Sequence, residues 1–140
     1  NMSPFENYQV MLGWAHYFEA EITESTNPAL LGQALTYSPM NTLSLWNRYQ
    51  FRDGVLDGLT VGLGGRWSEA ARMSPNPDRV MIIPEFTVID AMLAYNFKVA
   101  GRDVRAQLNV KNLTDKVYRE GNLGMFAAPR SIMLSFSTRL

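Results

Sequence analysis

Cysteine is absent from this chain of 140 residues, and histidine occurs once. The absence of cysteine excludes disulfide bonds and thiolate metal sites, and it fits an envelope compartment. With one histidine and no cysteine, no nucleophile has a credible general base. No group of residues has the spacing of metal ligands. We therefore expect neither an enzyme nor a protein with its own metal or cofactor.

Long apolar runs and an excess of one charge are also missing. Charged residues interrupt every apolar run well short of the roughly 18 residues that indicate a transmembrane helix. The 13 basic and 13 acidic residues give a formal net charge of zero, and they form no basic stripe that would suggest nucleic acid. The start at Asn1 lacks the features of a signal peptide, so a secreted protein would carry its signal elsewhere.

A strict alternation of apolar and polar residues dominates the last third of the chain. From Val104 onward, every second residue is apolar. The intervening residues are Arg105, Gln107, Asn109 and Lys111. The segment from Ser131 to Leu140 repeats this period of two, which predicts two β-strands with one apolar and one polar face.

The free-energy cost of burying a charge in lipid predicts which face of these strands would point to lipid and which to the lumen. An Arg or Lys that faces the bilayer midplane of a membrane barrel costs about 2 to 4 kcal/mol. Arg105 and Lys111 are therefore expected to point inward, toward a wet lumen. A soluble β-sandwich has the same alternation, with its apolar face turned to a protein core. Alternation alone leaves both architectures open.

The remaining strands follow from the same period and from turn residues. About six strands are predicted in all. They run over residues 8–23, 39–51, 59–68, 86–97, 104–111 and 131–140. His16 and Asn47 are polar residues on otherwise apolar faces. For His16, a neutral imidazole near a membrane interface is favoured over a ligand or a catalytic group, because there is no second histidine to pair with it.

The connections between these strands alternate between long and short. The long ones cover residues 26–38, 69–84 and 114–128, and the short ones cover 53–57 and 99–102. Membrane barrels have short periplasmic turns and long extracellular loops. The long connections are therefore expected outside the cell, and the carboxyl terminus in the periplasm.

Aromatic residues at the strand ends agree with this topology. Membrane barrels carry aromatic girdles at both interfaces. Five aromatic residues are predicted at the periplasmic rim, namely Tyr8, Tyr49, Phe51, Tyr95 and Phe97. Phe18 and Trp67 are predicted at the outer rim. A soluble sandwich would leave this clustering at strand ends unexplained.

A series of short motifs runs along nearly the whole chain in a specific order. They are Leu45-Trp46-x-x-Tyr49-x-Phe51, Gly62-x-Gly64, Pro84-x-Phe86-Thr87-Val88-x-Asp90, Leu108-Asn109-Val110-x-Asn112-Leu113-x-Asp115-Lys116-x-Tyr118 and Ala128-Pro129-Arg130. In order and spacing, the chain resembles the carboxyl-terminal barrel segment of TonB-dependent outer-membrane receptors, and it looks most like the ferric-siderophore branch. Phe86 and Leu140 depart from the family pattern, which usually has Tyr and a terminal aromatic residue there.

This resemblance implies an all-β fold, an antiparallel transmembrane segment that forms the last part of a barrel of roughly 22 strands. It also implies TonB-coupled uptake of a ferric siderophore, whose iron is held by the siderophore rather than by the protein. The chain would be the carboxyl-terminal part of the barrel over residues 1–140, without the plug domain, the earlier strands or the short TonB-contacting box. Partners would be the siderophore, the TonB complex through the missing amino-terminal region, and outer-membrane lipid.

Ligand or plug contacts are expected on the lumen face. The candidates are Trp46, Arg48, Arg66, Asp90, Arg105 and Lys111. They are interpreted either as contacts to an anionic chelate or the plug, or, preferably, as ion pairs along the barrel wall. Glu19, Glu21 and Glu24 lie close in sequence, and a solvated wall explains them better than catalysis.

Other functions remain open from the sequence. A related receptor could carry haem, cobalamin or glycans on the same barrel. A passive outer-membrane channel or adhesion barrel and a soluble β-sandwich binding module are further alternatives. The motif from Asn112 to Lys116 is interpreted as a strand exit and turn, in which Asn and Asp satisfy local backbone groups.

Overall fold

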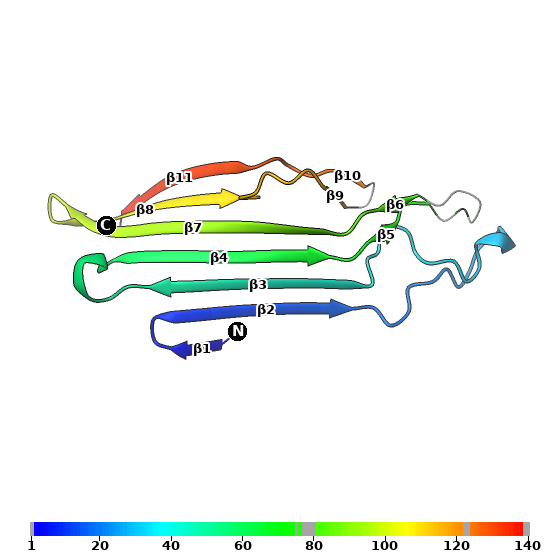
Figure 1. Cartoon of the computed structure of the whole chain (residues 1–140), viewed down its shortest axis with the longest axis horizontal. Helices are drawn as coiled ribbons and strands as arrows, with labels where there is room; N and C mark the ends of the chain where they lie inside the picture. Colours follow the sequence, from blue (N-terminus) through cyan, green and yellow to red (C-terminus); the bar gives the residue numbers. More distant parts are fainter. Residues whose placement is uncertain (1, 75, 77–80, 122–123, 139–140) are drawn as a thin grey trace.

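The protein forms one curved antiparallel sheet with small hairpins at one end (Figure 1). A computed structural model describes residues 2–74, 76, 81–121 and 124–138. The sheet has seven strands in the order β1-β2-β3-β4-β7-β8-β11. Their bounds are β1 (Met2–Phe5), β2 (Tyr8–His16), β3 (Asn41–Gln50), β4 (Leu59–Ser68), β7 (Phe86–Val99), β8 (Arg102–Lys111) and β11 (Ser131–Thr138).

The long connections carry two small hairpins that periodicity did not predict. The first pairs β5 (Ala71–Arg72) with β6 (Ile82–Ile83), and the second pairs β9 (Arg119–Glu120) with β10 (Met125–Phe126). Two single 3₁₀ turns, η1 (Pro28–Leu30) and η2 (Gly54–Leu56), complete the secondary structure of the described residues. No helix in this part of the chain is long and apolar enough to cross a membrane.

The predicted meander is confirmed, with two corrections. The first predicted strand is too long, because β2 ends at His16 rather than near Thr23. Beyond His16 the Tyr17 amide still donates to the Met40 carbonyl at 2.9 Å, and the regular ladder then gives way to an isolated bridge between Glu21 and Ala34. The alternation of apolar residues there continued past the point where strand pairing stops. The sheet also contains β1, a strand that the sequence did not indicate.

The two faces of the sheet follow the predicted register. Pairing places Leu93, Leu108 and Leu134 side by side in one row. The apolar face includes Val10, Leu12, Trp14, Leu43, Leu45, Leu63, Leu93, Leu108, Ile132, Leu134 and Phe136. It is open to its surroundings, since Leu12 is 59% and Phe136 67% exposed. An apolar surface of this extent requires apolar surroundings, such as lipid.

Long and short connections lie at opposite ends of the sheet, as predicted (Figure 1). The tight turn between β7 and β8 has Ala100 at φ 49° and Gly101 at φ 78°. Two successive residues with positive φ match the twist of a two-residue hairpin, and glycine takes this conformation at no steric cost. Aromatic rings lie close together at the short-turn end, with centroid distances of 4.8 Å for Tyr49 to Phe51 and 6.0 Å for Tyr95 to Phe97, and their role as a membrane girdle stays a prediction.

The two polar residues on the apolar face both have partners. The Tyr8 hydroxyl donates a hydrogen bond to Asn47 Oδ1 at 2.7 Å. At the other end of the sheet, His16 Nδ1 lies 2.7 Å from Asn41 Oδ1. A polar group in an apolar environment costs less when it is hydrogen-bonded, so both misfits are compatible with lipid on this face.

The assignment of faces can be tested on β11 with two neighbouring residues. Leu134→Arg should lower the free energy of unfolding by about 2 to 4 kcal/mol, because it places a charge in lipid near the midplane. Ser135→Arg, one residue further on the opposite face, should be close to neutral. Urea unfolding in lipid vesicles measures both, and equal losses would contradict the assignment.

Candidate functional site

All six sequence candidates lie on the face opposite the apolar one, which we call the polar face. Trp46 and Arg48 come from β3, Arg66 from β4, Asp90 from β7, and Arg105 and Lys111 from β8. The strand register puts their side chains on this face. They do not form one centre, because they are spread over four strands and most of the length of the sheet. Their role in ligand or plug contact stays a prediction.

Trp46 packs across two glycines of the neighbouring strand. Its register partner is Gly64, and Gly62 lies two residues earlier in β4 on the same face. A Cβ atom added at Gly62 would lie 2.7 Å from the Trp46 ring, too close for real atoms. The Gly62-x-Gly64 motif is therefore explained by the indole that covers it.

Asp90 anchors the end of β8. Its Oδ1 accepts a hydrogen bond from the Asn112 backbone at 2.8 Å, and the Leu113 backbone donates to the Ile89 carbonyl at 2.7 Å. These bonds fix the point where the chain leaves the sheet. Asp90 is thus engaged by its own chain and contributes to structure.

Asn112 forms the centre of the turn that follows. Its side chain donates to the Lys116 carbonyl and accepts from the Lys116 amide, both at 2.9 Å. The residue is 3% exposed and has φ 51°, a left-handed conformation that asparagine tolerates better than most residues. The predicted strand exit and turn is confirmed.

Asp115 joins this turn to the start of β11. Its Oδ1 accepts from the Arg130 amide at 2.9 Å, and the Arg130 guanidinium lies 3.8 Å from Oδ2. The motif from Asn112 to Lys116 and the Ala128-Pro129-Arg130 motif are therefore two halves of one hydrogen-bonded unit. This unit closes the base of the third long connection, so that its two ends are fixed.

Arg105 belongs to a ladder of amide side chains along β8. It donates to Gln107 Oε1 at 3.2 Å and to Asn96 Oδ1 at 3.3 Å, and Gln107 donates to Asn109 at 3.0 Å. Neutral amides rather than carboxylates hold the guanidinium. The preferred interpretation, ion pairing along the barrel wall, does not describe these contacts of Arg105, because its partners are amides.

Arg66 is the candidate that contacts a loop. Its Nη1 donates to Glu120 Oε2 at 2.8 Å and its Nη2 to the Tyr118 hydroxyl at 3.2 Å. The Tyr118 ring packs on Phe86 with centroids 4.5 Å apart. Burial and the neighbouring Glu120 carboxylate raise the pKa of the Tyr118 phenol, so the hydroxyl stays protonated and neutral. Together these contacts hold the hairpin β9–β10 against the polar face.

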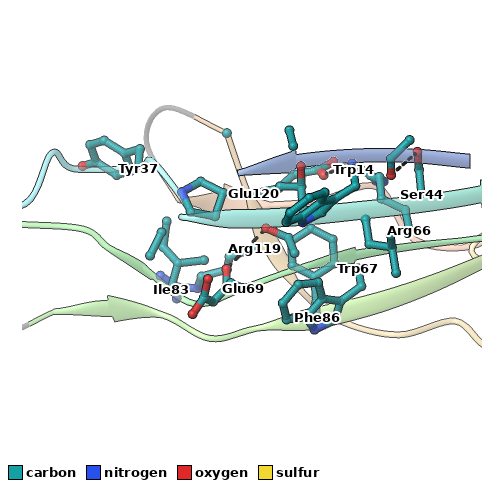
Figure 2. Close-up of a pocket in the computed structure, with 18 residues that line it drawn as sticks. Trp14, Tyr37, Ser44, Arg66, Trp67, Glu69, Ile83, Phe86, Arg119 and Glu120 are labelled. Carbon is teal, nitrogen blue, oxygen red and sulfur yellow. Dashed lines mark hydrogen bonds and ion pairs between the residues drawn. The ribbon is translucent and has the colours of Figure 1, made fainter. Parts of the chain in front are cut away.

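A cavity of about 490 Å³ opens beside this contact, at the long-loop end of the sheet (Figure 2). Its charged lining residues are Arg66, Glu69, Arg119 and Glu120, and its aromatic ones include Tyr37 and Phe86. Of the six sequence candidates, Arg66 lines this cavity. The sequence missed the loop residues, since Tyr37, Arg119 and Glu120 lie in segments without periodicity. No local pattern in the sequence could have indicated them.

The three long connections contact one another around the cavity. The Tyr37 amide donates to the Arg72 carbonyl at 2.7 Å, and the Arg72 side chain donates to Gln33 at 2.8 Å. Gly124 packs against Met73 and Ile83, leaving no room for a side chain. The first and second connections are therefore joined by hydrogen bonds, and the second and third by packing.

The described residues contain no cluster of metal-binding side chains. No three His, Cys, Asp or Glu side chains come together in this part of the chain.

Phe18, predicted on the outer rim, lies beyond β2 and is 88% exposed, with its ring edge-on to His16 at 4.8 Å. Trp67 does lie on β4, paired with Leu43 near the long-loop end.

Comparisons with known proteins agree with this geometry. The sequence profile described as "TonB dependent receptor-like, beta-barrel" matches residues 5–113. The chain belongs to the TonB-dependent receptor β-barrel family. Members of this family are outer-membrane β-barrels and act as receptors, so the predicted fold class is confirmed and the family itself is not enzymatic.

Two of the relatives are named for ferrioxamine B and for ferrichrome. The chain is 34% identical over 121 residues to the ferrioxamine B receptor of Salmonella typhimurium, which covers 81% of this chain and 17% of the relative. It is 34% identical over 111 residues to the ferrichrome outer membrane transporter/phage receptor of Escherichia coli, covering 77% and 14%. The chain therefore spans less than a fifth of the length of these relatives.

A solved structure extends the likeness over nearly all of the fold. The ferric preacinetobactin receptor of Acinetobacter baumannii superposes with a TM-score of 0.84 at 26% identity, covering 97% of this chain and 20% of that receptor. This TonB-dependent receptor segment thus has the shape of part of a barrel wall. The open edges at β1 and β11 agree with a partial barrel.

The hydrogen-bonded turn at Asn112 gives a testable consequence. Asn112→Gly keeps the positive φ but removes both side-chain bonds to Lys116, and should cost roughly 1 to 3 kcal/mol of stability. Asn112→Ala should cost more, because alanine resists the left-handed conformation. Thr114→Ala, at an exposed position of the same turn, is the control. Urea unfolding in vesicles ranks the three, and a loss at Thr114 equal to that at Asn112 would contradict the role of the turn.

Proposed function

We propose that this chain is the carboxyl-terminal wall of a TonB-dependent receptor that takes up a ferric siderophore. The observation that carries the proposal is the combination of a lipid-compatible apolar face with a polar face that is joined to loops around a cavity. The relatives named above are receptors or transporters for ferrioxamine, ferrichrome and preacinetobactin. Their shared cargo is a ferric siderophore, which supports this substrate class over haem, cobalamin or glycans.

The longer protein supplies what this segment does not contain. Because the relatives are about five times longer or more, we propose that the earlier strands and a plug domain belong to the same polypeptide. Contact with the TonB complex would run through that amino-terminal region. Seven strands at a spacing of about 4.8 Å span too little circumference to enclose a plug alone.

The long connections are the parts of this segment proposed to meet a ligand. They lie at one end of the sheet and surround the cavity, whereas the other end carries tight turns and an aromatic cluster. Membrane barrels place long loops outside the cell and short turns in the periplasm. The carboxyl terminus is accordingly proposed to be periplasmic, since β11 ends beside the short turns.

For the six lumen candidates we propose two kinds of contact, one with a ligand and one with the plug, and we leave Asp90 and Lys111 outside both. Arg66 lines the cavity and is placed to meet a ligand that enters from outside. Trp46, Arg48 and Arg105 lie further from the long loops along their strands, where a plug would fill the barrel. Asp90 holds the β8 exit, and Lys111 ends the same strand.

Growth under iron starvation tests the function. A strain without its other siderophore receptors, but carrying the intact receptor with this segment, should grow on one ferric siderophore of a panel. Growth should stop when TonB is removed, because the uptake is energy-dependent. TonB-independent growth would indicate a passive barrel instead. Growth on haem, cobalamin or a glycan alone would assign another cargo.

Cysteine labelling of whole cells tests the topology, and no native cysteine of this segment competes with an introduced one. Val117→Cys, in the third long connection and 79% exposed, should react with a membrane-impermeant maleimide on intact cells. Val55→Cys, in the short turn after β3 and 99% exposed, should react only after the outer membrane is permeabilised. The reverse order would invert the proposed orientation.

A further inference from the structure

A groove of about 230 Å³ lies on the apolar face, close to the short-turn end of the sheet. The strands β2, β3 and β4 run side by side there (Figure 1). The lining of the groove includes Tyr8 from β2, Asn47 and Tyr49 from β3, and Val61 and Leu63 from β4. Apart from Asn47, these side chains are aliphatic or aromatic. The groove is continuous with the outer surface through which a membrane barrel contacts lipid.

Asn47 lies in an otherwise apolar row of this groove. Strand pairing places it between Val10 of β2 and Leu63 of β4. Its Oδ1 accepts the hydrogen bond from the Tyr8 hydroxyl, which orients the amide. In the part of the chain that the structure describes, its Nδ2 group makes no hydrogen bond. An amide N–H without an acceptor costs free energy in an apolar environment, so the groove favours an occupant that brings an acceptor.

The depth of the groove indicates which acceptor a lipid would offer. Aromatic side chains are enriched where the headgroups meet the hydrocarbon, and the rings of Tyr8 and Tyr49 lie 6.5 Å apart beside the groove. From Tyr49 to Asn47 the strand rises roughly 7 Å, which is about 5 Å of depth at a tilt of about 40°. Each interfacial layer of a bilayer is roughly 5 to 8 Å thick. Asn47 therefore lies at the inner boundary of this layer, where ester carbonyls join the acyl chains to the headgroup.

We propose that this groove is a binding site for a diacyl glycerophospholipid. One acyl chain lies against Val61 and Leu63, and an ester carbonyl of the same lipid accepts a hydrogen bond from Asn47 Nδ2. Tyr8 is a positioning residue, because its hydroxyl holds the other end of the amide. The site is independent of the cargo of the receptor. The proposed topology enters only by assigning the lipid to the periplasmic leaflet.

Other occupants match the groove less well. A bound water needs two or more polar partners, whereas this groove offers one amide among aliphatic and aromatic side chains. Arg48 and Gly62 also border it, but the register points the Arg48 side chain to the polar face. A hydrocarbon chain alone would leave Asn47 Nδ2 without an acceptor. A diacyl lipid supplies both an apolar chain and a carbonyl at the matching depth.

A pair of matched lipids tests the carbonyl contact. One probe is a phosphatidylethanolamine with ester-linked chains, and the other is its ether-linked analogue with the same headgroup and chain length. The ether lipid lacks the carbonyls but keeps the apolar chains. Native mass spectrometry of the intact receptor, purified in detergent with equal amounts of both lipids, measures how much of each lipid is retained. The wild type should retain the ester lipid better than the ether lipid.

Two variants assign this preference to the groove. Asn47→Leu removes the donor and keeps a side chain suited to lipid, and it should lower the ratio of ester to ether lipid by about two- to tenfold, the effect of one hydrogen bond. Leu63→Ala is the control, because it weakens the apolar contact with both lipids and should leave their ratio as in the wild type. Lipids bound elsewhere on the barrel affect all three receptors alike. Heat-modified migration on gels confirms that each receptor is folded.

Two results would overturn the lipid site. One is an equal ratio of ester to ether lipid in the wild type and in Asn47→Leu. The other is a receptor dimer that Asn47→Leu separates, since it would assign the groove to a second copy of the receptor. Lipid retention is independent of transport. A receptor that fails the siderophore growth assay but loses its ester preference in Asn47→Leu keeps the lipid site and loses the proposed cargo, and the opposite pair of results does the reverse.

Discussion

The alternation of side chains along each strand is the constraint on which the rest of this structure depends. In lipid, every backbone amide and carbonyl needs a partner within the protein, and a sheet supplies these partners only through its neighbouring strands. The fixed period of two then assigns each residue to lipid or to the wet face. Leu93, Leu108 and Leu134 form one outward row because the register of three strands agrees.

The polar face is specialised along its length. Its middle is built from packing and amide contacts, such as Trp46 on its glycines and Arg105 among Asn96 and Gln107. These contacts stabilise a wall. Toward the long loops the same face carries Arg66, which contacts a hairpin from a distant part of the chain. The same alternation therefore places wall-stabilising contacts in the middle of the sheet and a loop contact beside the cavity at its long-loop end.

The loops of this segment are organised rather than independent. Asn112, Asp115 and Arg130 close the base of the third connection, and small apolar contacts join it to the second. Loops that meet ligands are usually held by a rigid scaffold, with local parts free to move. Here Asn112 and Asp115 fix the base of the third connection, and Arg66 contacts its hairpin through a solvent-exposed ion pair with Glu120.

The sequence by itself determined the strands of the main sheet from β3 onward, their faces, the tight turns and the turn at Asn112, because each depends on local period or local hydrogen bonding. It overran β2 and missed β1 and both hairpins, since short strands leave no period to detect. Only the tertiary structure decided that Arg66 contacts Glu120 and Tyr118, and that Asp90 anchors the β8 exit. These contacts join residues far apart in sequence, and their geometry depends on how loops fold back over the sheet.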